Sequence, residues 1–126
     1  MILADTSIWV DHLRGKKNSL KDYLEEGHIL VHPFIIGELA CGNLKNRGAI
    51  LTMMGNLPSA VIASDEEVME FINTRSLFGL GIGYIDVHLL AATALTRDAL
   101  LWTADKRLEK VALQEGLGYS PADKDV

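Results

Sequence analysis

Short apolar runs alternate along this chain with longer segments whose apolar residues recur at helical spacing. The short runs predict strands at 2–4, 29–31, 60–63 and 99–103. The longer segments predict helices at 6–13, 19–26, 33–44, 49–54, 85–96 and 104–114, and one more that begins after Ser64. Strands that alternate with helices in this way predict a parallel sheet with helices on both faces.

Local signals mark several helix ends. Thr6 or Ser7 is expected to cap the first helix, and Ser64 with Glu67 three residues later predicts a capping box. Pro33 occupies a position where the first turn of a helix tolerates proline. The segment 77–83 contains three glycines and predicts a flexible connection, and residues 123–126 are expected to form a frayed tail.

Length and composition favour a single globular domain over residues 1–126, with 48% hydrophobic and 23% charged residues. Cys41 is the single cysteine, so no intramolecular disulfide forms, as is typical of a reducing cytoplasm. No apolar segment reaches the ~18 residues of a membrane span. The net charge of −5 argues against a polyanion binder held by bulk charge. It still permits a nuclease, since bound metal ions reverse the local charge.

Four acidic residues stand out by their positions: Asp5, Glu38, Asp86 and Asp105. Asp5 and Asp105 follow apolar runs, so they fall at the carboxyl ends of predicted parallel strands, where such sheets hold their working sites. Glu38 and Asp86 lie within helical patterns of mostly apolar, small residues, and the strand rule does not place them. Four carboxylates brought together would suit Mg²⁺ or Mn²⁺.

Each acid also has a simpler interpretation. Asp5 and Asp105 could merely cap helices. Asp86 could interact with a helix dipole, and Glu38 could be a solvated helix residue. The chain carries no nucleophile elbow, P-loop, Cys-x-x-Cys or His-Glu-x-x-His motif that would indicate a different chemistry. The four histidines show no repeating ligand spacing, which favours structural or surface roles for them.

The segments around the four acids resemble the PIN-domain ribonucleases, in particular the VapC toxins of toxin–antitoxin modules. They are ILADTSIWVDHLRG, PFIIGELACG, GIGYIDVHLLAATAL and LLWTADKRLEKVA, and they follow one another in the family's order over nearly the whole chain. The resemblance implies a three-layer α/β/α, Rossmann-like fold with a central parallel sheet. It also implies a Mg²⁺- or Mn²⁺-dependent endoribonuclease acting on RNA in the cytoplasm, as a homodimer that a cognate antitoxin neutralises.

Carried over position by position, the resemblance makes Asp5, Glu38, Asp86 and Asp105 an acidic quartet. Asp5 and Asp86 would contact the metal directly, and Glu38 would complete the ion's shell or position a water. Asp105 would act through water or a second ion.

Neighbouring polar residues have two interpretations each. Thr6, Ser7 and Thr103 lie beside the acids and would hydrogen-bond a carboxylate or a phosphate, unless they simply cap helices. Arg14, Lys16 and Lys17 follow the first helix and would meet RNA phosphates, unless they form a solvated loop. Two other functions stay open: a catalytically silent PIN-like module that binds RNA or protein, and a metal nuclease acting on DNA or structured ends.

Overall fold

Three short parallel strands form the centre of this computed structural model, which describes residues 1–121. The strands are β1 (Ile2–Ala4), β2 (Ile29–Leu30) and β3 (Leu100–Trp102), and they lie in the order β2-β1-β3. Ile2 pairs with Ile29 on one side and Leu100 on the other. Because β1 is the middle strand, its carboxyl end lies beside the carboxyl ends of both neighbours.

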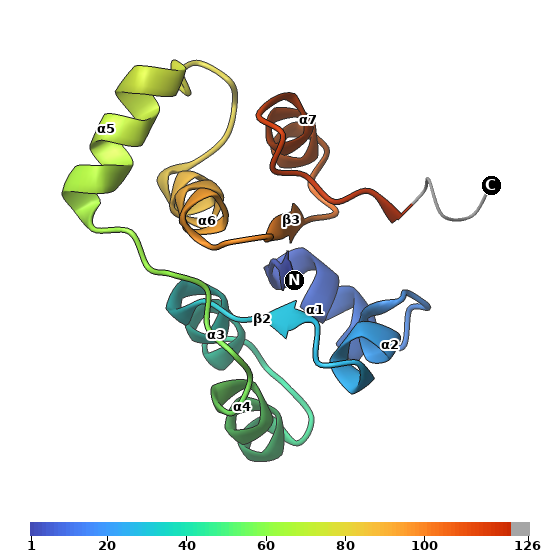
Figure 1. Ribbon diagram of the computed structural model, residues 1–126. Coiled ribbons are helices and arrows are strands. Elements are labelled where there is room, and N and C mark those ends of the chain that lie inside the picture. The colour runs from blue at the N-terminus through green and yellow to red at the C-terminus, as the bar shows by residue number, and fades with distance from the viewer. Residues whose placement is uncertain (122–126) are drawn as a thin grey trace.

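Seven helices follow and separate the strands within residues 1–121. They are α1 (Thr6–Leu13), α2 (Leu20–Glu25), α3 (Pro33–Ala40), α4 (Arg47–Gly55), α5 (Asp65–Arg75), α6 (Tyr84–Leu95) and α7 (Lys106–Gln114). Figure 1 shows α1 and α2 on one side of the strands, α3 and α6 on the other, and α7 beyond β3. The predicted three-layer α/β/α fold with a central parallel sheet is therefore confirmed.

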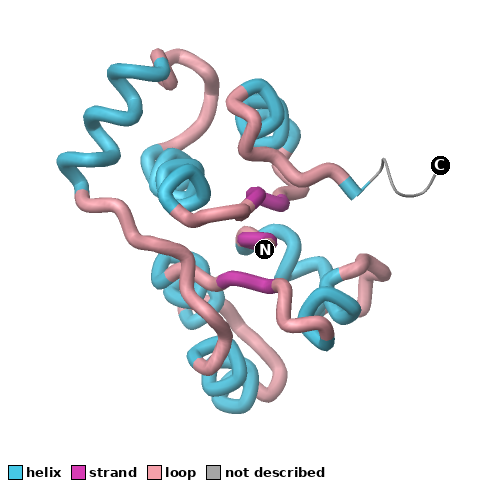
Figure 2. The backbone as a smooth tube through the Cα atoms, viewed as in Figure 1, coloured by secondary structure: helices cyan, strands magenta, loops and turns pink. Residues whose placement is uncertain are grey.

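Burial is concentrated in the strands and in α6. Leu3 and Ala4 in β1 are completely enclosed, and α6 is buried continuously from Val87 to Thr93. Figure 2 shows the strands, in magenta, surrounded by the cyan helices. The burial of α6 explains why its middle is mostly apolar, since a helix buried on every side has no polar face. In the described residues 1–121, no helix has the length and apolar character needed to cross a membrane.

The predicted strand at 60–63 is wrong. Only an isolated bridge between Val31 and Ser59 forms there, after which the chain leaves the sheet. Val61 and Ile62 are 49% and 54% exposed, whereas Ala60 and Ala63 are buried, so only the two ends of this run reach the core. Periodicity alone does not distinguish a buried strand from an extended surface segment of the same composition.

Helix ends agree with the sequence except at two places. The capping box forms as predicted, with Ser64 Oγ accepting from Glu67 N at 3.1 Å and Glu67 Oε1 accepting from Ser64 N at 2.9 Å. The helix expected to reach residue 44 ends at Ala40, because the Arg47 guanidinium takes up the Ala40 carbonyl from outside that helix. The cap of α1 is Asp5, not Thr6 or Ser7. The expected tail at 123–126 lies outside the described residues.

Candidate active site

Asp5 is the most enclosed of the four acidic residues, with 7% of its surface exposed. It follows β1 and caps α1, so its Oδ1 atom accepts from Ser7 N at 3.0 Å, from Ile8 N at 3.4 Å and from the Ser7 hydroxyl. Its Oδ2 atom accepts from Thr103 Oγ1 at 2.5 Å. Every one of these donors is neutral, so no cation in residues 1–121 pairs with this carboxylate.

Burial raises the pKa of the Asp5 carboxyl above its ordinary value of 3.8, because desolvation disfavours the charged form. Hydrogen bonds from Ser7, Thr103 and Ile8 lower that pKa but do not cancel the rise. Asp5 is thus oriented by four donors, and none of the cations in the described residues pairs with it. A cation bound beside it would stabilise its charged form.

Asp105 is linked to Asp5 by hydrogen bonds of the residues that follow β1 and β3. Thr103 Oγ1, which donates to Asp5, accepts from Asp105 N at 3.0 Å, and Ser7 Oγ accepts from Ala104 N at 3.0 Å. The Asp105 side chain caps α7, with Oδ1 accepting from Arg107 N at 2.9 Å. The helix-cap interpretation therefore holds for both Asp5 and Asp105, and it does not exclude a second role.

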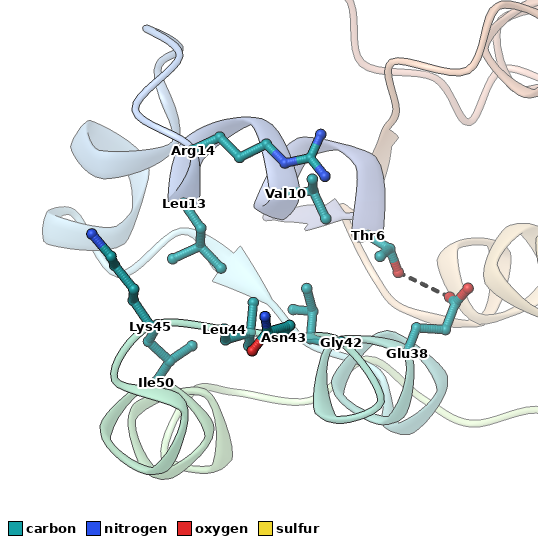
Figure 3. Close-up of a pocket in the computed structure, with 11 residues that line it drawn as sticks. Thr6, Val10, Leu13, Arg14, Glu38, Gly42, Asn43, Leu44, Lys45 and Ile50 are labelled. Carbon is teal, nitrogen blue, oxygen red and sulfur yellow. Dashed lines mark hydrogen bonds between the residues drawn. The ribbon is translucent and has the colours of Figure 1, made fainter.

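Glu38 lies on α3 and reaches toward the first turn of α1. Its Oε1 atom accepts from Thr6 Oγ1 at 2.9 Å, as Figure 3 shows. Because Thr6 follows Asp5 directly, this bond ties α3 to the same end of the sheet. Glu38 is exposed, and it shares a shallow hollow with Ile85 of α6, the residue before Asp86.

Asp86 is half-buried in the first turn of α6, where Oδ2 accepts from Gly83 N at 3.1 Å. The expected interaction with the positive end of a helix is therefore present. The residues around it are fixed by α5: Tyr84 Oη donates to Asp65 Oδ1 at 2.9 Å, and His88 Nε2 lies 3.1 Å from the same oxygen. Asp86 is thus held between two anchored neighbours.

Residues 2–113 match the sequence profile of the family described as the PIN domain. The chain belongs to the PIN domain family. Among its relatives are Ribonuclease VapC32 of Mycobacterium tuberculosis strain CDC 1551 / Oshkosh and Ribonuclease VapC32 of strain H37Rv. Each is 38% identical to this chain over 120 residues, which cover 95% of this chain and 97% of the relative.

PIN-domain nucleases are metal-dependent, so the fit of a metal ion to these residues matters. The donors are carboxylate oxygens, which hard divalent cations prefer. Glu38 Oε2, Asp86 Oδ1 and Asp105 Oδ2 receive no hydrogen bond from residues 1–121, so these three acids each keep an oxygen free. Both oxygens of Asp5 already accept hydrogen bonds. The chemistry of this PIN domain therefore fits a divalent ion.

The four acids do not form a closed cluster in the described part of the chain. No group of three or more His, Cys, Asp or Glu side chains in residues 1–121 lies close enough to hold a metal ion. Asp5 and Asp105 are linked through Thr103, Glu38 is linked to Thr6, and Asp86 bonds within its own helix. The shared metal site of this PIN domain stays a prediction.

The cations predicted to meet RNA are separated by the structure. Arg14 lines a groove that also contains Thr6 and Glu38. Lys16 Nζ instead lies 3.8 Å from Asp11 Oδ2, and Lys17 is exposed in the loop before α2. Lys45 lines the same groove and was missed by the sequence analysis. A cation that follows α3 by five residues carries no local sequence signal, so only the packing of α1 against α3 reveals its position.

Proposed function

We propose that this protein is a metal-dependent endoribonuclease that hydrolyses RNA phosphodiester bonds, and that it is the toxin of a toxin–antitoxin pair. Its membership of the PIN domain family and its two ribonuclease relatives support this function. The observation that carries it is Asp5, a buried carboxylate at the carboxyl end of the central strand that pairs with no cation of residues 1–121. Such a carboxylate is stabilised when a metal ion supplies the missing charge.

Asp5 and Asp86 are the residues proposed to bind the ion, Mg²⁺ or Mn²⁺. Glu38 completes the ion's shell or positions the attacking water, and Asp105 acts through water or a second ion. Bound there, a divalent ion would make a water more acidic and stabilise the leaving oxygen of the phosphodiester. Whether one or two ions bind is set by how far Asp105 can approach Asp5.

The hydroxyl residues of the site orient these carboxylates. Thr103 and Ser7 hold the two oxygens of Asp5, and Thr6 holds one oxygen of Glu38. A carboxylate fixed in this way needs little rearrangement when it binds an ion, which favours binding. Arg14, Lys16 and Lys17 are proposed to meet the RNA phosphates.

A toxin of this kind acts in the cytoplasm, as a homodimer, and is neutralised by a cognate antitoxin protein. A second function is supported by the absence of a closed acidic cluster among residues 1–121. It is a catalytically silent PIN-like module that binds RNA or protein and does not cut.

The decisive test is RNA cleavage by the purified chain with Mg²⁺ or Mn²⁺ and with EDTA. We expect cleavage that EDTA stops and that Asp5→Asn abolishes. Asp22→Asn, which changes an exposed carboxylate on α2, is the matched control and should cleave normally. Cleavage that persists in EDTA or in Asp5→Asn would contradict the metal-dependent mechanism. RNA binding without any product would favour the silent module.

A further inference from the structure

A groove runs between α1 and the segment that joins α3 to α4, and it begins at the Thr6–Glu38 hydrogen bond. Figure 3 shows Thr6 and Glu38 at one end of this groove and Lys45 at the other. Its volume is about 280 Å³, close to the lower limit of roughly 300 Å³ for small-molecule sites. It therefore has room for a group of nucleotide size and lacks room for a folded domain or a duplex.

The floor of the groove is apolar and incompletely covered. It is lined by Val10, Leu13, Leu39, Leu44 and Ile50. Leu39 is buried, but the other four remain only half-buried, so apolar surface faces the opening. Covering this surface with the flat face of a base would remove it from water, which is favourable.

Two cations border the groove from opposite sides. Figure 3 shows Arg14 at the end of α1 and Lys45 on the segment after α3. Both are exposed, and neither has an ion pair with a carboxylate of residues 1–121. In a chain with a net charge of −5, this pairing of free cations across one opening is suited to an anionic ligand.

The Lys45 side of the groove is held in place before any ligand binds. Arg47, the first residue of α4, donates from Nε at 3.1 Å and from Nη2 at 2.9 Å to the Ala40 carbonyl. This fork closes the segment between α3 and α4 against the end of α3. A preformed rim costs less ordering entropy on binding than a mobile loop would.

We propose that this groove binds one nucleotide of the RNA strand next to the cleaved bond. The base lies on the apolar floor, and the flanking phosphates meet Arg14 and Lys45. The inference rests on the proposed ribonuclease function, because Thr6 and Glu38 at the groove's end belong to the candidate site. A strand that leaves the site along this path passes both cations, which explains their placement.

The test compares two variants of the full chain that remove the same charge. Arg14→Ala/Lys45→Ala changes the groove, and Lys21→Ala/Lys110→Ala removes two exposed cations on α2 and α7. Binding is measured by fluorescence anisotropy with a labelled single-stranded RNA of mixed sequence. Asp5→Asn is present in both variants to prevent cutting. Each measurement is repeated over a series of salt concentrations.

We expect the groove variant to bind RNA at least about tenfold more weakly, which is the loss of one charge-assisted contact. The slope of log affinity against log salt should fall by about 1.4 in magnitude, or about 0.7 for each lost phosphate contact. In cleaving chains with Asp5 intact, the groove variant should raise KM and leave kcat nearly unchanged. The control should match the Asp5→Asn chain in affinity and slope, and the natural chain in KM.

Equal affinity and equal slope in the two variants would overturn the inference. The proposed function survives that result if the natural chain and the control still cut RNA. A natural chain that neither binds nor cuts RNA removes the proposed function and this inference together.

Discussion

Arg107 lies directly across Gly81, so that a Cβ atom on Gly81 would stand 3.0 Å from both Cδ and Nη1 of Arg107. Arg107 follows Asp105 by two residues, and Gly81 belongs to the loop that leads to Asp86. The contact therefore joins the segments that carry two of the four acids. Gly81 also has φ +78°, a conformation that favours glycine.

Replacing Gly81 by alanine should destabilise the fold more than replacing Gly79 does. Both glycines have positive φ, +70° at Gly79, so each alanine costs about 1–2 kcal/mol of backbone strain. Only Gly81→Ala also displaces Arg107, since a Cβ at Gly79 meets nothing within 4 Å. We expect an additional loss of about 0.5 kcal/mol or more in urea unfolding. In an Arg107→Ala background the two glycine variants should become equivalent, and equal losses without that background would refute the contact.

Thr103→Val should reduce both stability and cleavage, because it leaves Asp5 Oδ2 buried without a donor. The expected loss is about 1–3 kcal/mol in the free energy of unfolding. Thr103→Ser keeps a hydroxyl and should restore most of the cleavage.

A matched control for Thr103 lies in α6. Thr93 is also buried, and its hydroxyl donates to the Leu89 carbonyl at 2.7 Å. It makes no hydrogen bond to any of the four acids in residues 1–121. Thr93→Val should change stability and leave the cleavage rate of the folded protein unaltered. Normal cleavage by Thr103→Val would show that the hydroxyl has no part in orienting Asp5.

Asp5→Asn should make the metal-free protein more stable at neutral pH. Burial raises the pKa of Asp5 in the folded chain. The group therefore contributes its full stabilisation below the ordinary pKa of 3.8, where it is protonated in both states. That stabilisation is lost as the pH rises through the folded-state pKa. Asparagine carries no charge and avoids that loss. The advantage should therefore disappear when the pH is lowered below 3.8.

Added Mg²⁺ should make the natural chain more stable than Asp5→Asn, which reverses their order of stability. At a concentration of about 100 Kd, an ion that binds only the folded state adds about 2.7 kcal/mol to the natural chain and little to Asp5→Asn. Thermal unfolding with Mg²⁺ and with EDTA measures both effects. A variant less stable than the natural chain at pH 7 in EDTA would contradict the assignment of Asp5 as an unpaired buried charge.

His32 should make the fold sensitive to mild acid. Its ring is fully buried, and its pKa is lowered from 6.5 by desolvation and, to a lesser extent, by His88. Because this pKa is lowered, neutral His32 contributes stability above pH 6.5, and the contribution is lost as the pH falls through the folded-state pKa. One proton limits the slope to about 1.4 kcal/mol per pH unit.

His32→Asn is the variant that tests this dependence. Nδ1 of His32 accepts from Phe34 N at 3.1 Å and so caps α3, and an asparagine oxygen can take that role. Urea unfolding between pH 7 and pH 5 should show a shallower pH dependence in His32→Asn than in the natural chain. An identical pH dependence in the two proteins would show that a group other than His32 causes the acid sensitivity.

The sequence predicts the strands of the sheet and the positions of two candidate site residues, Asp5 and Asp105, because one periodic signal marks both. An apolar run that ends in an acid gives a strand and a residue at its carboxyl end, and Asp5 and Asp105 lie there as expected. The same signal fails at 60–63, where Val61 and Ile62 are apolar but exposed. Burial depends on what packs against a segment, and a single sequence does not record that.

The remaining acids illustrate the limit of local patterns. Glu38 meets Thr6 across 32 positions of sequence, and no spacing rule relates them. Their roles come from the resemblance to PIN-domain ribonucleases. The contact of Arg107 with Gly81 and the placement of Lys45 beside Arg14 likewise depend on how helices pack. Sequence periodicity therefore identifies elements more reliably than it identifies neighbours.

The bond between Thr103 and Asp5 joins residues that are 98 positions apart. A ribosome makes β1 about 100 residues before β3, so a growing chain lacks one edge of its sheet until β3 has emerged. Until then Asp5 has neither the Thr103 hydroxyl nor Asp105 beside it. A product released before Thr103 is made therefore carries Asp5 without one of its hydrogen-bond donors.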